Sequence, residues 1–196
     1  MRSGEESTDD LDALARLRID VFRAYPYLYD GSIEYERQYL AGYVRAPSSV
    51  IVAVWDGGAM VGASTAVAMT EAEPEFREPL IARDLDPSEI FYFGESVLLP
   101  GYRGLGVGHR FFDEREAAAA RHGSRQTCFA AVVRDPGDPR RPADYRSLEP
   151  FWAKRGYARL PGATTTFRWK EVGADQETEQ RMEFWMRTIE GEVDAR

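Results

Sequence analysis

The sequence is poor in the residue types on which several classes of site depend. Its 196 residues include one cysteine, Cys128, and two histidines, His109 and His122. A single cysteine excludes an internal disulfide. Two histidines are too few to support either a catalytic Ser-His-Asp triad or a metal cluster convincingly. We therefore expect no metal site, and we interpret Cys128, which no motif partners, as a buried and inert thiol.

Basic residues and long apolar runs are also scarce. Lys and Arg total 25 against 33 Asp and Glu, which gives a formal net charge of −8. Without a basic block, the chain is a poor candidate for binding nucleic acid or an anionic membrane. The longest apolar run, residues 50–55, is far shorter than the roughly 20 residues of a membrane span. Because residues 1–12 are polar and acidic rather than signal-like, we expect a cytoplasmic location.

What the sequence has instead is a glycine-rich turn between a strand and a helix. A buried strand is predicted over residues 91–99 and ends at Pro100, which cannot donate to a sheet, and helix formers run over 109–121. The turn between them carries one arginine and three glycines: Arg103, Gly104, Gly106 and Gly108. Glycines before a helix leave backbone N–H groups unshielded, and with the helix dipole these groups form an anion site. We interpret the turn as a phosphate-binding loop rather than as a ligand-free connection.

The spacing of this turn excludes two common phosphate-binding motifs. The dinucleotide pattern G-x-G-x-x-G needs a glycine where His109 stands, and the P-loop needs Lys and Ser or Thr where Val107 and Gly108 stand. The pattern that remains, Arg-x-x-Gly-x-Gly from Arg103 to Gly108, resembles the acetyl-CoA pyrophosphate loop of the GNAT acetyltransferase superfamily. A second stretch, Phe-Trp-Ala-Lys-Arg-Gly-Tyr at 151–157, is similar to that family's late Phe-Tyr-x-Lys-x-Gly-Phe motif.

Hydrophobic periodicity, caps and turn residues predict the order of the other elements. Besides the strand, turn and helix above, we expect two helices, a hairpin, an acidic connection, a strand, a short helix and two more strands, at residues 8–22, 32–46, 49–69, 71–88, 126–133, 148–155, 157–160 and 163–170. This order is similar to the GNAT order over about residues 8 to 170.

The resemblance implies the fold class. We expect an α/β (α+β) domain with a mixed, mostly antiparallel central sheet flanked by helices, in which the strands ending near Leu99 and Val133 splay apart to admit the cofactor. We assign residues 1–170 to a single GNAT-like acyl-CoA N-acyltransferase domain. Residues 171–196 are expected to form a C-terminal extension, with an amphipathic helix at 176–190 that packs on the same domain.

The resemblance also implies acetyl-CoA as the co-substrate and names the residues that would bind it. Arg103 and the glycine amides would hold the pyrophosphate, and the amides of Leu98 and Leu99 would align the pantetheine arm and polarise the thioester carbonyl. The expected cofactor-binding residues are Val97, Leu98, Leu99, Arg103, Gly104, Leu105, Gly106, Val107, Gly108 and Trp152.

One of these positions departs from the family pattern. Many members carry a tyrosine that protonates the departing CoA sulfur, where this chain has Trp152. An indole N–H is not a usable acid at neutral pH. Three alternatives follow: the thiolate leaves without help, a hydroxyl such as that of Tyr145 or Ser147 substitutes, or the protein does not catalyse transfer.

Glu95 is the candidate catalytic base. An amine is mostly protonated near neutral pH, so the site must accept a proton before the amine can attack a thioester. Glu95 stands in an otherwise apolar strand, where the family often carries an acid facing the substrate cleft. A carboxylate there is costly unless it is paired or functional. The alternative interpretation is therefore a salt bridge to an arginine.

The acceptor is expected to lie against the loop at residues 25–31. Its candidate substrate-binding residues are Tyr25, Tyr27, Tyr29 and Asp30, which either pack over the core edge or form a substrate wall between two helices. The acidic segment at 71–88 is either a solvated connection or a lid that favours a cationic amine. With the resemblance, these features predict a monomeric or homodimeric N-acetyltransferase acting on a small-molecule or peptide amine. The alternative is a non-catalytic acyl-CoA-binding or sensing module.

Overall fold

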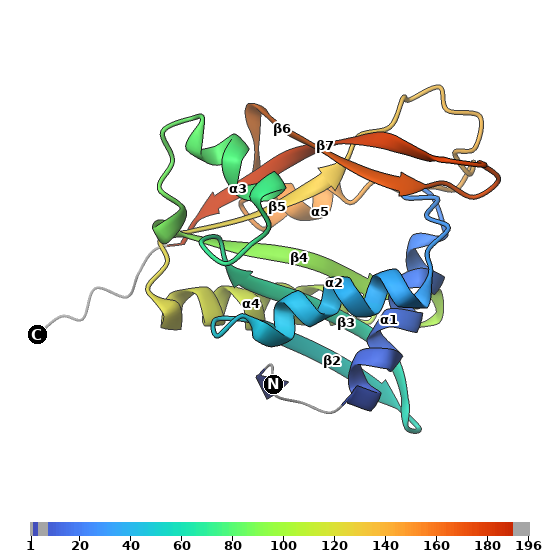
Figure 1. The fold of residues 1–196 in the computed structure, drawn as a ribbon, viewed down its shortest axis with the longest axis horizontal. Coiled ribbons are helices and arrows are strands. Elements are labelled where there is room, and N and C mark those ends of the chain that lie inside the picture. Colours follow the sequence, from blue (N-terminus) through green and yellow to red (C-terminus); the bar gives the residue numbers. More distant parts are fainter. Residues whose placement is uncertain (1, 4–7, 190–196) are drawn as a thin grey trace, which may run out of the picture.

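The computed structural model describes residues 2–3 and 8–189, with side chains from residue 10 onward. Its centre is a seven-stranded sheet in the order β1-β2-β3-β4-β5-β7-β6 (Figure 1). The helices and strands in chain order are β1 (Arg2–Ser3), α1 (Thr8–Phe22), α2 (Ile33–Arg45), β2 (Val50–Asp56), β3 (Ala59–Ala68), α3 (Pro74–Ile81), β4 (Ile90–Leu98), α4 (Val107–His122), β5 (Gln126–Val132), α5 (Glu149–Lys154), β6 (Ala158–Lys170) and β7 (Glu177–Thr188). Across the described residues, no helix combines the length and apolar composition that crossing a bilayer requires.

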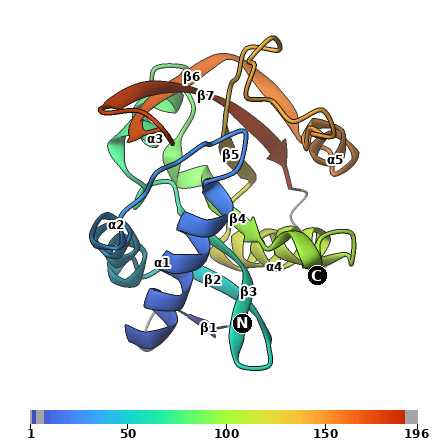
Figure 2. The same cartoon turned by 90° about the vertical axis from the view of Figure 1, so that its right-hand side faces the viewer.

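Helices cover both faces of the sheet. Figure 2 shows α1, α2 and α3 on one side and α4 and α5 on the other. The core beneath α2 and α3 contains Tyr92 and Phe184, and the core beneath α4 and α5 contains Phe93, Phe112 and Trp185. The neighbours Tyr92 and Phe93 thus point to opposite faces, as side chains along a strand do. The predicted fold class, a mixed and mostly antiparallel sheet flanked by helices, is confirmed.

The sheet opens between its two parallel strands. β4 and β5 pair over three residues of each strand, from Ile90↔Gln126 to Tyr92↔Cys128, although β4 runs on to Leu98. Figure 1 shows the two strands diverging beyond this point. The expected splay of the central strands is therefore confirmed. It leaves the second half of β4 without a strand partner on the side of β5.

The predicted C-terminal helix is wrong. This segment contains strand β7, which lies between β5 and β6 and pairs with both. Met182, Trp185 and Met186 fit a helical spacing. However, Met182, Phe184 and Met186 also alternate along a strand, and they join the core beneath α2 and α3 while Trp185 joins the opposite one. The described part of the expected extension therefore belongs to the sheet of the domain, and the residues after 189 lie outside the description.

The two short strands predicted after α5, at residues 157–160 and 163–170, form a single strand in the structure. β6 runs from Ala158 to Lys170, with an irregularity in its pairing between Arg159 and Thr164. Pro161 lies at this irregularity. A proline is tolerated there because β6 is an edge strand, whose open side needs no N–H donor.

Cys128 lies fully buried in β5. Burial raises the pKa of its thiol well above the ordinary value, so little thiolate is present at neutral pH. We predict that DTNB modifies the native protein at least about tenfold more slowly than the protein in denaturant, because only an exposed thiolate reacts readily. Equal rates in the two states would show that β5 is open to solvent, contrary to its position in the sheet.

Candidate active site

The predicted phosphate-binding turn leaves an open surface at the start of α4. Gly104 and Gly106 have φ angles of 78° and 83°, a left-handed conformation in which a Cβ atom is unfavourable. Apart from its chain neighbours, a Cβ added to either glycine would meet no atom within 4 Å, and residues 103–106 are exposed, so the turn is open to solvent. Gly106 is the N-cap of α4 and offers no side chain to the helix. The first helical N–H groups, those of Val107 and Gly108, are therefore available to an anion.

The other residues of the turn differ in what they offer a ligand. Arg103 is exposed, donates from Nε to the Leu98 carbonyl at 3.3 Å and pairs with no carboxylate of the described residues. Leu105 is 72% exposed. Gly108 lies inside the helix, where an added Cβ would be 3.7 Å from Phe151, an ordinary contact. Arg103 is thus a cation of this turn that is free to meet a phosphate.

Near the end of β4, the backbone N–H of Leu98 faces the gap between β4 and β5. Leu98 lies opposite Gly62 on β3, and the N–H of the next residue, Leu99, donates to the Val61 carbonyl at 3.0 Å. Because hydrogen-bonding direction alternates along an antiparallel strand, the N–H of Leu98 points away from β3 and into the gap. The expectation that the Leu99 amide also faces the cofactor is wrong, since the sheet already uses it. The side chain of Val97 is fully buried with residues of α1.

Trp152 packs among aromatic rings of the core beneath α5. Its ring centroid lies 5.0 Å from that of Phe129 and 5.2 Å from that of Trp185. Both contacts are edge-on, a favourable arrangement for aromatic pairs. Trp152, which stands where the family motif has a tyrosine hydroxyl, thus packs in the core of this chain.

Tyr145 and Ser147, the two hydroxyls considered as substitutes, have different surroundings. Ser147 Oγ accepts the N–H of Glu149 at 3.2 Å, at the start of α5. The Tyr145 hydroxyl bonds none of the described residues, and its ring stands edge-on to Tyr25 with 4.7 Å between centroids. Partial burial, with the neighbouring Tyr25 adding, raises the pKa of Tyr145. Tyr145 therefore keeps its proton at neutral pH, and no acceptor among the described residues takes it.

Glu95 lies in a buried ionic cluster that joins α1, α2 and β4. Its carboxylate oxygen Oε2 is 2.6 Å from Nη1 of Arg18 and accepts a hydrogen bond from the Tyr39 hydroxyl at 3.4 Å. Nε of Arg18 also donates to the carboxylate of Glu36, which is fully buried. The salt bridge that the sequence left open as the alternative for Glu95 is thus present.

This cluster, formed by Arg18, Glu36 and Glu95, holds more negative than positive charge. Burial on its own lowers the pKa of Arg18, but Glu95, Tyr39 and Glu36 together outweigh it and raise that pKa well above its ordinary value. Two carboxylates therefore share one permanent cation. Oxygen Oε1 of Glu36 and oxygen Oε1 of Glu95 are buried and accept no hydrogen bond from the described residues. Oxygen Oε1 of Glu95 is thus an acceptor that no described donor uses, even though the other oxygen of this carboxylate is ion-paired.

Tyr27 connects the tyrosine loop to this cluster. Its ring centroid lies 4.4 Å from that of Phe22 and 5.9 Å from that of Trp169, so the ring packs over the edge of the core. Burial raises the pKa of Tyr27 to about 12, with Arg18 and Glu95 close enough to influence it. The packing interpretation of Tyr27 is therefore confirmed, and its contact with an acceptor stays a prediction.

The side chains of Tyr29 and Asp30 interact with other residues of the protein. Burial, with Glu36 adding, raises the pKa of the Tyr29 hydroxyl well above its ordinary value. Asp30 pairs with Arg23 at 2.9 Å and with Lys170 at 3.0 Å, which ties the loop to the end of β6. We therefore interpret Asp30 as a structural residue of the loop wall rather than as a direct ligand of an amine.

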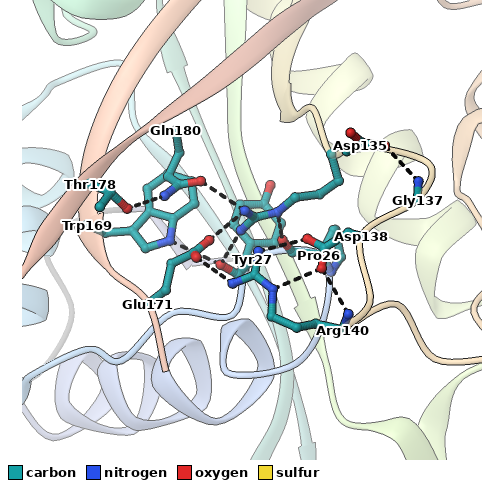
Figure 3. A network of polar contacts seen from close by, with 11 residues as sticks. Pro26, Tyr27, Asp135, Gly137, Asp138, Arg140, Trp169, Glu171, Thr178 and Gln180 are labelled. Atoms are coloured by element: carbon teal, nitrogen blue, oxygen red, sulfur yellow. Dashed lines mark hydrogen bonds and ion pairs between the residues drawn. The ribbon is translucent and has the colours of Figure 1, made fainter. Parts of the chain in front are cut away.

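A second network, which sequence reasoning missed, fixes the tyrosine loop against the sheet. Arg134, two residues after β5, donates to the carbonyls of Pro26 and Tyr27 at 2.5 and 2.9 Å and pairs with Glu171 at 2.5 Å. Figure 3 shows Pro26, Tyr27, Glu171 and Gln180 together in this network. No sequence pattern marks Arg134, because two of its acceptors are backbone carbonyls 107 and 108 residues earlier.

The parts of the candidate site lie along one strand and the turn after it. Glu95 and the free N–H of Leu98 belong to β4, and the anion-binding turn at Gly106 follows directly. This arrangement can bind a phosphate ester, orient a carbonyl group in the gap and accept a proton. Within the part of the chain that the structure describes, no three His, Cys, Asp or Glu side chains are placed to hold a metal ion.

Many solved structures have a similar architecture. A ribosomal-protein-alanine N-acetyltransferase from Brucella melitensis aligns with a TM-score of 0.60 at 13% identity, covering 94% of this chain and 97% of that chain. An N-acetyltransferase from Staphylococcus aureus Mu50 gives 0.60 at 14% identity, covering 94% and 96%. An aminoglycoside 6'-N-acetyltransferase complexed with coenzyme A gives 0.57 at 17% identity, covering 97% and 98%.

These similarities show that the chain has the fold of the GNAT N-acetyltransferases. Because the identities are low, they concern the fold alone. No protein-family model matches the chain, and no curated protein matches it in sequence.

Proposed function

We propose that this chain is an N-acetyltransferase that moves an acetyl group from acetyl-CoA to a primary amine of a small molecule or peptide by direct attack. The observation that carries this proposal is the parting of β4 and β5, with the N–H of Leu98 facing the gap and the open glycine turn directly after it. The similar solved structures described as N-acetyltransferases, one of them complexed with coenzyme A, support it.

The residues of the turn and strand fit acetyl-CoA as a co-substrate. Arg103 and the N–H groups of Val107 and Gly108 would hold the pyrophosphate. Arg103 pairs with no carboxylate of the described residues, and no side chain caps these N–H groups, so all three donors can bind an anion. The N–H of Leu98 would donate to a carbonyl in the gap and polarise it. Acetyl-CoA supplies the activated acetyl group when bound.

Glu95 would accept the proton that the amine must lose. Its Oε1 is free while Arg18 holds its Oε2, so the carboxylate is fixed in orientation with one oxygen available. The amine nitrogen then bonds to the acetyl carbon as the carbon–sulfur bond breaks, and CoA leaves as a thiolate or thiol. Tyr145 is the residue that could donate a proton to that sulfur, since Trp152 serves the core.

A second candidate function is a non-catalytic acyl-CoA-binding or sensing module. The packing of Trp152 between Phe129 and Trp185 favours it, because this chain lacks the acid that the family pattern places there. The salt bridge from Arg18 to Glu95 favours it as well. Steady release of CoA with any amine would exclude this alternative, since a binding module turns nothing over.

A thermal-shift titration tests the cofactor. We expect acetyl-CoA and free CoA, each at about 100 times its Kd, to stabilise the protein by about 2.7 kcal/mol and raise its melting temperature, whereas NAD should not. Arg103→Ala should weaken CoA binding by at least about tenfold, since a lost charge-assisted hydrogen bond costs about 1.5–3 kcal/mol.

Arg168→Ala is a matched control for the loss of one surface arginine. Arg168 lies on edge strand β6 and pairs with Glu179 at 3.3 Å, away from the turn. This variant should bind CoA as the wild type does. Absence of a shift with either CoA species would overturn the assignment of the turn, and the fold would stand without it.

A further inference from the structure

A small cavity lies between α2 and α3, against β3 and β4. We call it the α2–α3 cavity; its volume is about 60 Å³. Pockets that take a whole drug-sized ligand measure roughly 300–1,000 Å³. The α2–α3 cavity is therefore of a size to receive one end of a ligand, such as a charged head with a short chain.

Aromatic residues are the largest group of side chains that line the α2–α3 cavity. Four rings line it, those of Tyr39, Tyr43, Phe76 and Tyr92. Phe76 stacks on Tyr92 with 4.5 Å between centroids, and the hydroxyls of Tyr39 and Tyr43 are 3.3 Å apart, so the rings hold one another in place. Arg18 already lies over the ring of Tyr39, whereas none of the described cations lies over the other three rings. The faces of neutral aromatic rings attract cations.

Two carboxylates, those of Glu71 and Glu73, also line the α2–α3 cavity. Neither makes a salt bridge to a described residue. Glu71 accepts hydrogen bonds from the backbone N–H and the hydroxyl of Ser48, at 3.1 and 2.7 Å. Glu73 is the N-cap residue of α3, yet its side chain does not cap the helix, and partial burial, with Glu75 adding, raises its pKa. The cavity thus carries negative charge that no cation of the described residues pairs with.

A helical glycine keeps the α2–α3 cavity open. Gly42 lies inside α2 and lines the cavity, and a Cβ added to it would meet nothing within 4 Å. A glycine inside a helix is unfavourable relative to alanine, and neither packing nor a positive φ angle requires one at this position. The missing side chain leaves room that even a methyl group would reduce.

We propose that the α2–α3 cavity binds the end of an alkylammonium chain. Its positive charge would lie by Glu71 and Glu73, and its methylene groups would pack against Tyr43, Phe76 and Tyr92. An alkylammonium fits both features, because the rings accept its apolar part and a cation, and the carboxylates accept its charge. Within the proposed function this group would belong to the amine acceptor, but its binding does not depend on acetyl transfer.

The test is a titration of the full chain with n-butylammonium chloride, followed by NMR, with n-butanol as the uncharged probe of equal length. We expect saturable binding of butylammonium at least about fivefold tighter than that of butanol. Glu73→Gln should weaken binding of butylammonium about threefold or more without changing that of butanol. Gly42→Leu, which fills the cavity, should abolish saturable binding of both.

Val44→Leu is the control for Gly42→Leu, because Val44 is exposed on the same helix, and it should bind as the wild type does. Equal affinity for the two probes, or wild-type binding by Gly42→Leu, would overturn the proposal. The Glu73 side chain is only partly buried, so its variant should fold and tests the site even if Gly42→Leu folds poorly. Addition of acetyl-CoA to the same samples distinguishes the source. Acetylation of butylamine that Glu73→Gln and Gly42→Leu weaken in step with binding assigns the cation to the acceptor, whereas unmodified amine, or acetylation that these variants leave unchanged, assigns it to a separate ligand of the same cavity.

Discussion

Replacing Arg18 with methionine is expected to destabilise the protein by about 3–5 kcal/mol. The change leaves Glu36 and Glu95, which are buried and share this one cation, without a positive partner. Denaturant unfolding measures the loss as a lower midpoint at unchanged slope. The loss should shrink as the pH falls, because the folded variant then binds protons on its stranded carboxylates more readily than the unfolded chain does, and proton uptake by the folded state stabilises it.

Two further variants show whether charge or side-chain volume causes this loss. The triple variant Arg18→Met, Glu36→Gln, Glu95→Gln removes both negative charges as well, and it should recover most of the stability, since replacing a buried ionic group as a whole is often nearly neutral. Arg37→Met is the surface control: Arg37 pairs with Asp12 at 2.7 Å between the same two helices but in solvent, so little change is expected. Equal losses in Arg18→Met and Arg37→Met would contradict a buried cluster.

Local signals in the sequence predicted the strand, turn and helix that carry the proposed cofactor-binding residues. Pro100 and the glycines of the turn mark where β4 ends and α4 begins, because backbone freedom and the lack of an N–H act within a few residues. Ser32 caps α2 as a residue of its type should, accepting the N–H of Tyr35. Such features need no information from distant parts of the chain.

The parts that sequence reasoning missed depend on distant contacts. The strand β7 has side chains that suit both a helical and an alternating pattern, and its partners β5 and β6 decide between them. The meeting of Arg18, Glu36 and Glu95 joins three elements, and no spacing in the sequence predicts which arginine pairs with which glutamate. Likewise, only the register against β3 reveals that Leu98, but not Leu99, has a free N–H.

The largest effect on activity is expected from Glu95→Gln. With an amine found by screening primary amines for CoA release, we expect kcat to fall by about 10²–10⁴-fold, the usual contribution of a general base. Glutamine keeps the shape and a hydrogen-bond acceptor for Arg18 but cannot take the proton from the ammonium group. The dependence of the rate on pH that comes from this base should also disappear. CoA binding, measured by thermal shift, should stay as in the wild type, because Glu95 is not part of the turn.

Glu36→Gln is the matched control that separates proton acceptance from disturbance of the ionic cluster. Both variants remove one carboxylate from Arg18, so any loss caused by the rearranged ion pairs appears in both. Only Glu95→Gln removes the carboxylate on the strand that faces the gap. We therefore expect Glu36→Gln to keep the pH dependence of the wild type, with a kcat well above that of Glu95→Gln. Wild-type rates for Glu95→Gln at every pH would remove Glu95 from the role of base, and its function would then be the ion pair with Arg18 alone.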